Sequence, residues 1–351
     1  MTSLSSVPET LRGMVERYSP SGQEAEAVAW LVERMQLLGA ANTFRDEAGN
    51  AVGVWGTGEK QIVLLGHIDT VPGRIETRLE GDLFYGRGAV DAKGPLAAFV
   101  DGAAAASSLD GWQVVVIGAV GEEADSEGAR YVAGQYRPQF AVIGEPSRWD
   151  RVTLGYKGSA WAQLTVRQPL AHSARKDESA CEAALRIWER VRAWVEVQNS
   201  EKEQVFEQVL SSLRGFQSGS DGLEEWAALQ IGTRLPLNLA PEAWYAQLGE
   251  MAAPARIEKR GFAVPAYRGE KNNGLVRAFL GGIRGQRTRP GFVLKSGTAD
   301  LNIVAPLWGC PAIAYGPGDS SLDHTPHERI SLEEYARAVQ VVSAALRQLC
   351  G

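Results

Sequence analysis

The chain has 351 residues, of which 44% are hydrophobic and 22% are charged, so it holds enough apolar material for two or three packed domains. Its 36 basic and 42 acidic side chains give a formal net charge of −6, which disfavours a nucleic-acid-binding protein. We find no apolar run long enough to cross a bilayer and no secretory signal sequence, and three cysteines are too few for a disulfide framework. These features predict a cytoplasmic globular protein.

The first 150 residues alternate helix and strand patterns. Ser21-Gly-Gln-Glu24 is a capping-box pattern that precedes an amphipathic helix over residues 25–38. Strands are predicted at 51–55, 61–68, 112–120 and 140–144, a hairpin at 78–85, and helices at 95–109 and 126–136. Strands separated by helices in this way predict an α/β layer with a largely parallel sheet.

The pattern changes after residue 155. A strand at 159–166 is followed by a charged helix at 178–197, a polar Ser/Gly-rich stretch at 211–222, a strand at 226–235, a helix at 241–252 and a strand at 255–264. The first style then returns with a helix at 273–283, an apolar strand at 310–315 and a last helix at 331–349. We therefore predict one discontinuous catalytic domain, residues 1–157 and 266–351, with an inserted α+β lid or dimerisation domain at 158–265.

Acidic and imidazole side chains follow the carboxyl ends of successive predicted strands, where α/β proteins place their sites. They are His67 and Asp69, the pair Glu122 and Glu123, Glu145, and the two histidines His324 and His327, while Asp91 lies in a glycine-rich loop before a helix. Each alone is most often an ordinary surface residue. Their repeated placement at one edge of the sheet favours a metal site.

The donor types indicate which metals would suit such a site. Two imidazoles with Asp91, Glu123 and Glu145 form a mixed nitrogen and oxygen set suited to Zn²⁺, Co²⁺ or Mn²⁺. Five ligands exceed the four of a closed tetrahedral site, so two ions sharing a carboxylate are expected. Glu122 would then be free to act as general base, and Asp69 would orient His67.

Two other patterns point to different functions, and both are weak. Gly56-Thr-Gly-Glu-Lys60 resembles a phosphate-binding loop but joins two strands and lacks the full spacing. Ser296-Gly-Thr-Ala-Asp300 lies near no nucleophile elbow, which disfavours a serine hydrolase.

In combination, four motifs resemble the dinuclear zinc amidohydrolases and peptidases of the M20 family. They are Gly66-His-Ile-Asp-Thr-Val-Pro72, Gly86-Arg-Gly-Ala-Val-Asp-Ala-Lys-Gly94, Gly121-Glu-Glu123 and Gly144-Glu145. The resemblance implies a zinc-peptidase-like catalytic domain with a mixed, largely parallel sheet. It also implies that His67, Asp91 and Glu145 hold one ion and that Asp91, Glu123 and His324 hold the second, with Asp91 bridging.

The same resemblance suggests residues around the substrate. His172 matches the lid histidine that reaches the partner subunit's site in this family, which implies a homodimer. Arg234 resembles the arginine that holds a substrate carboxylate, and Gly297 and Thr298 resemble the family's Gly-Thr substrate loop. Two positions depart from the family's pattern, because Gln168 stands in place of a usual glycine and Gly232 in place of a usual acid.

Three stretches are most like the M20 branch that serves the α-aminoadipate route of lysine biosynthesis: Tyr85 to Leu96, Gly144-Glu-Pro-Ser147 and Thr153-Leu-Gly-Tyr-Lys-Gly158. That branch releases L-lysine, and in some relatives L-ornithine, from the C-terminal glutamate γ-carboxyl of a small acidic amino-group carrier protein. The alternatives are a deacylase of a free metabolite, such as acetylornithine or succinyl-diaminopimelate, and a metal-binding dimeric protein without catalysis. Every position that matches a family ligand is chemically intact, which disfavours a protein without catalysis.

Overall fold

The computed structural model describes residues 4–106, 109–172, 174 and 176–351, and the chain divides into two compact units. The first unit combines Met1–Gly155, Gly269–Leu294 and Ala299–Gly351, and the second combines Tyr156–Arg268 and Lys295–Thr298. The predicted insertion, 158–265, has similar limits. The inclusion of residues 295–298 in the second unit differs from the prediction, because nothing in their local pattern marks them as separate from the apolar segments around them.

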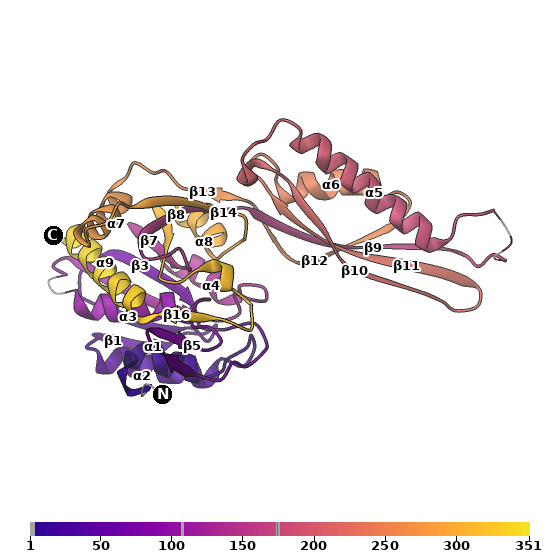
Figure 1. Ribbon diagram of the computed structural model, residues 1–351. Helices are drawn as coiled ribbons and strands as arrows, with labels where there is room; N and C mark the ends of the chain where they lie inside the picture. Colours follow the sequence, from indigo (N-terminus) through magenta and orange to yellow (C-terminus); the bar gives the residue numbers. More distant parts are fainter. Residues whose placement is uncertain (1–3, 107–108, 173, 175) are drawn as a thin grey trace. The chain divides into compact units, whose positions relative to one another are not determined.

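A large mixed sheet forms the centre of the first unit (Figure 1). Its strands lie in the order β1-β2-β6-β3-β7-β15-β8, and β14 also pairs with β8. Their bounds are Asn42–Arg45 (β1), Ala51–Trp55 (β2), Lys60–His67 (β3), Trp112–Ala119 (β6), Phe140–Gly144 (β7), Arg151–Tyr156 (β8), Gly291–Lys295 (β14) and Ala312–Tyr315 (β15). The four central strands β6, β3, β7 and β15 are parallel, so their carboxyl ends meet at one edge.

Seven α-helices pack on this sheet or on one another within the described part of the first unit. They are Glu9–Glu16 (α1), Ala25–Leu37 (α2), Lys93–Ala105 (α3), Glu127–Gln135 (α4), Gly274–Gly285 (α7), Leu301–Trp308 (α8) and Leu332–Cys350 (α9). Helix α3 lies against β3, β6 and β7, and α9 covers α3 and α7. A Cβ at Gly66 would lie 3.1 Å from the Leu96 Cβ, so glycine lets α3 approach the strand that carries His67.

A small second sheet belongs to the same unit and has the strand order β16-β5-β4. Its strands are Arg78–Glu80 (β4), Leu83–Tyr85 (β5) and Arg329–Ser331 (β16). The pairing of β16 with β5 brings the segment after His324 close to the glycine-rich loop that contains Asp91.

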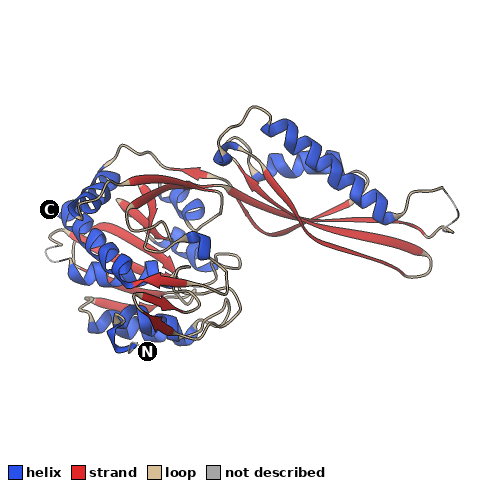
Figure 2. Cartoon of the chain, in the orientation of Figure 1, coloured by secondary structure: helices blue, strands red, loops and turns tan. Residues whose placement is uncertain are grey.

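The second unit is an antiparallel sheet with two helices on one side (Figure 2). The strands are Gly158–Pro169 (β9), Leu210–Ser220 (β10), Glu224–Leu235 (β11) and Arg256–Val264 (β12), in the order β10-β11-β9-β12. The short strand Tyr267–Arg268 (β13) is not part of this sheet. Helices Ala180–Asn199 (α5) and Pro241–Ala252 (α6) bury Ile187, Trp244 and Leu248 against Leu164 and Leu229. This unit therefore has its own hydrophobic core.

Two local predictions are wrong. Ser21 does not cap the first long helix, because its hydroxyl donates to Asp69 Oδ2 instead and Glu24 takes the N-cap position. The polar stretch at 211–222 falls largely within strand β10, which pairs along its length with β11. An edge strand can form from a sequence with little apolar alternation because its neighbour supplies the hydrogen bonds.

Short 3-10 helices occur at Leu4–Ser6, Val205–Glu207 and Ser320–Leu322. Among the described residues, every helix is too short or too polar to span a bilayer.

Candidate metal centre

His67 ends strand β3 with its ring almost completely enclosed, at 1% exposure. Its Nδ1 lies 3.0 Å from the main-chain oxygen of Asp69, and its Nε2 lies 3.3 Å from Asp91 Oδ1. Because a carbonyl oxygen can only accept a hydrogen bond, Nδ1 carries a proton. Nε2 is then the nitrogen that could bind a metal ion on the Asp91 side. Burial lowers the pKa of His67, but the carboxylates of Asp69 and Asp91 outweigh it and raise that pKa well above its usual value.

Asp69 is fully buried and holds the turn that follows strand β6. Its Oδ1 accepts the main-chain N–H of Glu122 at 3.1 Å, and its Oδ2 accepts that of Glu123 at 3.0 Å. The Ser21 hydroxyl donates to Oδ2 at 2.6 Å, and His67 Nδ1 lies 3.4 Å from Oδ1. One carboxylate thus sets the positions of an imidazole and of two neighbouring glutamates.

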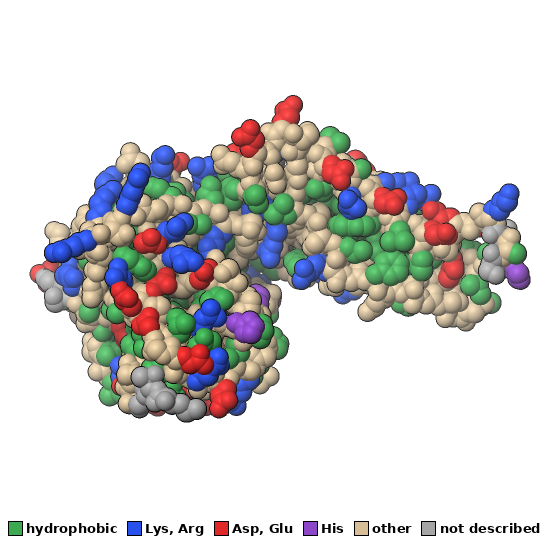
Figure 3. All heavy atoms as spheres, in the orientation of Figure 1, with side chains coloured by type: hydrophobic (Ala, Val, Ile, Leu, Met, Phe, Trp, Pro, Cys, Tyr) green, Lys and Arg blue, Asp and Glu red, His purple; other side chains and the backbone are tan. Residues whose placement is uncertain are grey.

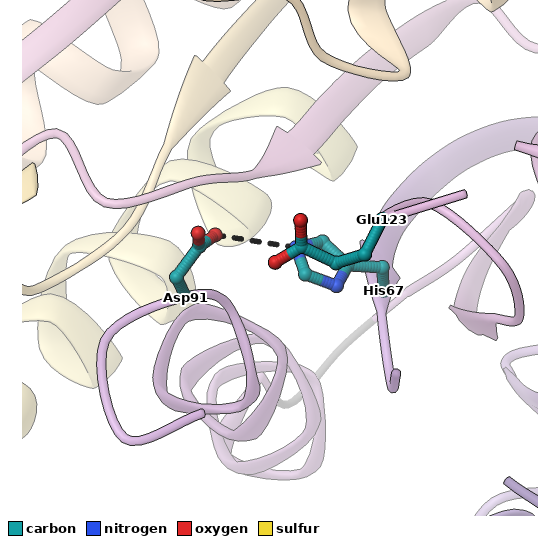
Figure 4. A group of neighbouring side chains, drawn as sticks. All are labelled: His67, Asp91 and Glu123. Atoms are coloured by element: carbon teal, nitrogen blue, oxygen red, sulfur yellow. Dashed lines mark hydrogen bonds and ion pairs between the residues drawn. The ribbon is translucent and has the colours of Figure 1, made fainter. Parts of the chain in front are cut away.

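Three of the predicted metal ligands converge. One donor atom each from His67, Asp91 and Glu123 lies within 4.8 Å of the others (Figure 4). Figure 4 shows Asp91 facing the His67 ring, with Glu123 entering beside the ring from the neighbouring segment. A nitrogen donor and two carboxylates at this spacing suit a divalent transition metal.

His324 adds a second imidazole to the same group. Its Nε2 lies 3.0 Å from Asp91 Oδ2 and 3.0 Å from Glu123 Oε1, so Asp91 faces one imidazole with each oxygen. These two carboxylates raise the pKa of His324 to about 10 although partial burial opposes the charge. His324 is half exposed, and Figure 3 shows imidazole side chains at the surface of the first unit. Burial alone would raise the pKa of Asp91, but His324 and His67 lower it.

The two remaining predicted residues of this site lie near the group. Glu145 directly follows β7 and is buried, although it is not one of the three residues that converge within 4.8 Å. Burial, together with the charges of Asp300, Glu145 and Glu123, outweighs the opposing charge of His67 and raises the pKa of Glu122 well above its usual value. A carboxyl group with a raised pKa is suited to taking up and returning a proton.

Sequence reasoning missed Asp300 as a part of this region. Its side chain is buried at the start of α8, bonds to Ser126, and leaves Oδ1 with no hydrogen-bond partner in the described structure. Burial chiefly raises its pKa to about 7. The sequence signal was weak, because an acid before a helix is normally read as an N-cap, and this side chain makes no capping bond.

The predicted substrate residues belong to the second unit. Arg234 Nη1 donates to Thr298 Oγ1 at 2.6 Å, and that hydroxyl donates to the main-chain oxygen of Lys157 at 3.1 Å. The structure therefore brings Arg234 and the Gly297-Thr298 pair together. His172 is exposed, and its Nδ1 accepts the main-chain N–H of Ala174 at 3.1 Å.

Comparison with known proteins matches most of the chain to one family. The sequence profile described as "Peptidase family M20/M25/M40" matches residues 63–348. A LysW-lysine hydrolase from Deinococcus radiodurans is 43% identical, with 98% of this chain and 97% of the relative covered. A putative LysW-lysine/LysW-ornithine hydrolase from Thermococcus kodakarensis is 38% identical, with 98% and 92% covered.

Solved structures agree on the fold. An M20 family metallo-carboxypeptidase from Sulfolobus solfataricus matches with a TM-score of 0.78 at 18% identity, and 97% of this chain and 98% of that chain are covered. This likeness confirms the predicted mixed α/β fold class.

Proposed function

The chain belongs to peptidase family M20/M25/M40 and is a hydrolase, and we propose that it releases L-lysine from the C-terminal glutamate γ-carboxyl of a small acidic amino-group carrier protein. The near full-length match to a LysW-lysine hydrolase carries this proposal. The name of the Thermococcus relative supports L-ornithine as a second leaving amine. In this role the enzyme would act in lysine biosynthesis and, where it releases L-ornithine, in arginine biosynthesis.

The donor set fits a divalent metal centre. Each oxygen of Asp91 faces an imidazole nitrogen, and the His324 imidazole also faces Glu123. A divalent cation would be stabilised by these neighbouring carboxylates. We assign His67, Asp91 and Glu145 to one ion and Asp91, Glu123 and His324 to a second, with Zn²⁺ as the first choice and Co²⁺ as an alternative. Bound there, such ions would acidify a water molecule and polarise the amide carbonyl.

Glu122 is the proton carrier in this proposal. It lies one residue before a proposed ligand and is partly buried, so its carboxylate can take a proton from the attacking water and return it to the departing α-amino group of lysine. Asp69 holds Glu122 and Glu123 by their main-chain N–H groups, which keeps the base and the ligand at a constant separation.

The second unit supplies the contacts to the substrate. The Arg234 guanidinium, with Thr298 beside it, is suited to a substrate carboxylate, since arginine offers several donors in one plane. We assign to His172 of the partner subunit the stabilisation of the oxyanion, which requires a homodimer.

The test is the intact mass of a γ-lysyl carrier-protein conjugate after incubation with the Zn²⁺-loaded enzyme. N-acetylornithine and N-succinyl-diaminopimelate are treated in parallel, and Glu122→Gln provides a variant with its metal ligands intact. We expect the carrier to lose the mass of one lysyl group with wild type only. Turnover of a small amide alone would replace the carrier substrate by a free metabolite, and inactivity on all three would refute the proposal.

A further inference from the structure

Glu328 lies four residues after His324 and is completely buried in the first unit. Its Oε1 accepts the main-chain N–H groups of Val90 at 2.9 Å and Asp91 at 3.0 Å. The side chain of Glu328 therefore anchors the main chain at the residue that faces both imidazoles of the candidate metal centre.

Arg87 completes this anchor from the other side. Its Nη1 donates to Glu328 Oε2 at 2.9 Å and to the main-chain oxygen of Thr325 at 3.2 Å. Its Nε donates to the main-chain oxygen of Gly73 at 2.9 Å. With only 7% of Arg87 exposed, the ion pair is shielded from water, so its geometry is held by several charge-assisted bonds.

The bonds of this pair join three segments that are distant in the sequence. One runs from His67 to Gly73, one runs from Arg87 to Asp91, and one runs from His324 to Glu328. Each segment carries a residue of the proposed metal centre. A change at the Arg87–Glu328 pair would therefore alter the spacing between ligands without removing any of them.

We propose that Glu328, held by Arg87, is a positioning residue of the metal centre, which fixes the main chain of Asp91 relative to His324. The inference rests on the metal-dependent hydrolase proposed above. It predicts that metal affinity depends on the two oxygens of Glu328, even though neither is a ligand.

Two substitutions separate the oxygens of Glu328. In Glu328→Gln, the amide oxygen can still accept from Val90 and Asp91, while the amide N–H groups face the Arg87 guanidinium, donor against donor. In Glu328→Ala, both anchors are lost. We expect overall Zn²⁺ affinity to fall roughly tenfold in Glu328→Gln and roughly 100-fold in Glu328→Ala, the range found when groups behind metal ligands are removed.

Asp101→Asn is the matched control. Asp101 is a carboxylate of the same unit that accepts hydrogen bonds from Thr10 at 2.5 Å and Tyr335 at 2.7 Å, and these three residues of helices α3, α1 and α9 lie outside the three segments described above. We expect this variant to melt at a lower temperature with unchanged Zn²⁺ affinity.

The measurement is Zn²⁺ binding to metal-stripped full-length protein by competition with a chromophoric chelator, together with thermal melting. Lower melting temperatures with wild-type affinity in both Glu328 variants would overturn the inference, since that is the result of a purely structural role. If Glu328→Ala fails to fold, Glu328→Gln against Asp101→Asn decides. A wild type that binds Zn²⁺ but leaves the carrier conjugate intact refutes the proposed function alone.

Discussion

Asp69 offers a test of how the metal centre is held, because asparagine has nearly the same shape as aspartate but one acceptor oxygen fewer. In Asp69→Asn, one of two acceptor oxygens becomes an NH2 group. Oδ1 faces the N–H of Glu122, and Oδ2 faces the N–H of Glu123 and the Ser21 hydroxyl. The hydroxyl can rotate to accept, but a main-chain N–H cannot, so either orientation of the amide leaves one buried N–H unpaired.

The cost of that unpaired group sets the expected magnitude. A buried donor without a partner costs about 1–3 kcal/mol, which corresponds to a factor of roughly 5–150 in the local opening equilibrium. We expect amide hydrogen exchange in the peptide that spans residues 120–126 to accelerate by that factor in Asp69→Asn. Zn²⁺ affinity should fall about 10- to 100-fold at the same time, because the His67 ring loses its orienting charge.

Ser21→Ala is the control for this experiment, because it removes one donor to Asp69 and leaves both main-chain bonds in place. Exchange in the same peptide should then change by less than in Asp69→Asn. Unchanged protection of residues 120–126 in Asp69→Asn would refute the claim that this carboxylate holds the turn.

Three further predictions concern the same site. Glu122→Gln should lower kcat by roughly 10²–10⁴ with an unchanged metal content, measured by hydrolysis and elemental analysis, and wild-type turnover would exclude Glu122 as the base. Chelation should abolish turnover and reduce stability by about 2.7 kcal/mol for each ion removed, relative to protein in metal at a hundred times Kd, seen in thermal melting and reversed by Zn²⁺. Asp300 has a pKa raised to about 7, so in the metal-free protein its burial reduces stability as pH rises from about 4 to 7. Asp300→Asn should therefore be more stable relative to wild type at pH 8 than at pH 4, and an equal difference at both pH values would contradict this assignment.

The residues of the candidate site could be predicted because their positions follow from strand geometry. His67, Glu123 and Glu145 come at the carboxyl ends of β3, β6 and β7, and parallel strands bring those ends together whatever the loops do. Local patterns also predicted the central strands and the last helix, which Ser331 caps by accepting the N–H of Glu334. These elements can be predicted because each depends on a pattern within ten or twenty residues of sequence.

The supporting groups could not be predicted, because they depend on segments that meet only in the folded chain. Ser21 fits a local capping pattern, but its hydroxyl bonds to Asp69, 48 residues away. Glu328 reaches Val90 over 238 residues of sequence. No local rule distinguishes such a glutamate from one on a solvated surface, so the sequence predicts the proposed ligands more readily than the groups that hold them.

The pKa directions in the site follow from two opposing causes, burial and the charges of neighbouring side chains. Acidic groups that face an imidazole, Asp69 and Asp91, have lowered values although burial opposes this. Glu122 and Asp300 have raised pKa values, because burial and neighbouring acids outweigh the imidazole charge there. The pKa values of His67 and His324 are also raised. The region thus holds more carboxyl groups than imidazoles. Asp69 and Glu328 fix the main chain where these charges gather, and a divalent cation bound there would offset the negative charge.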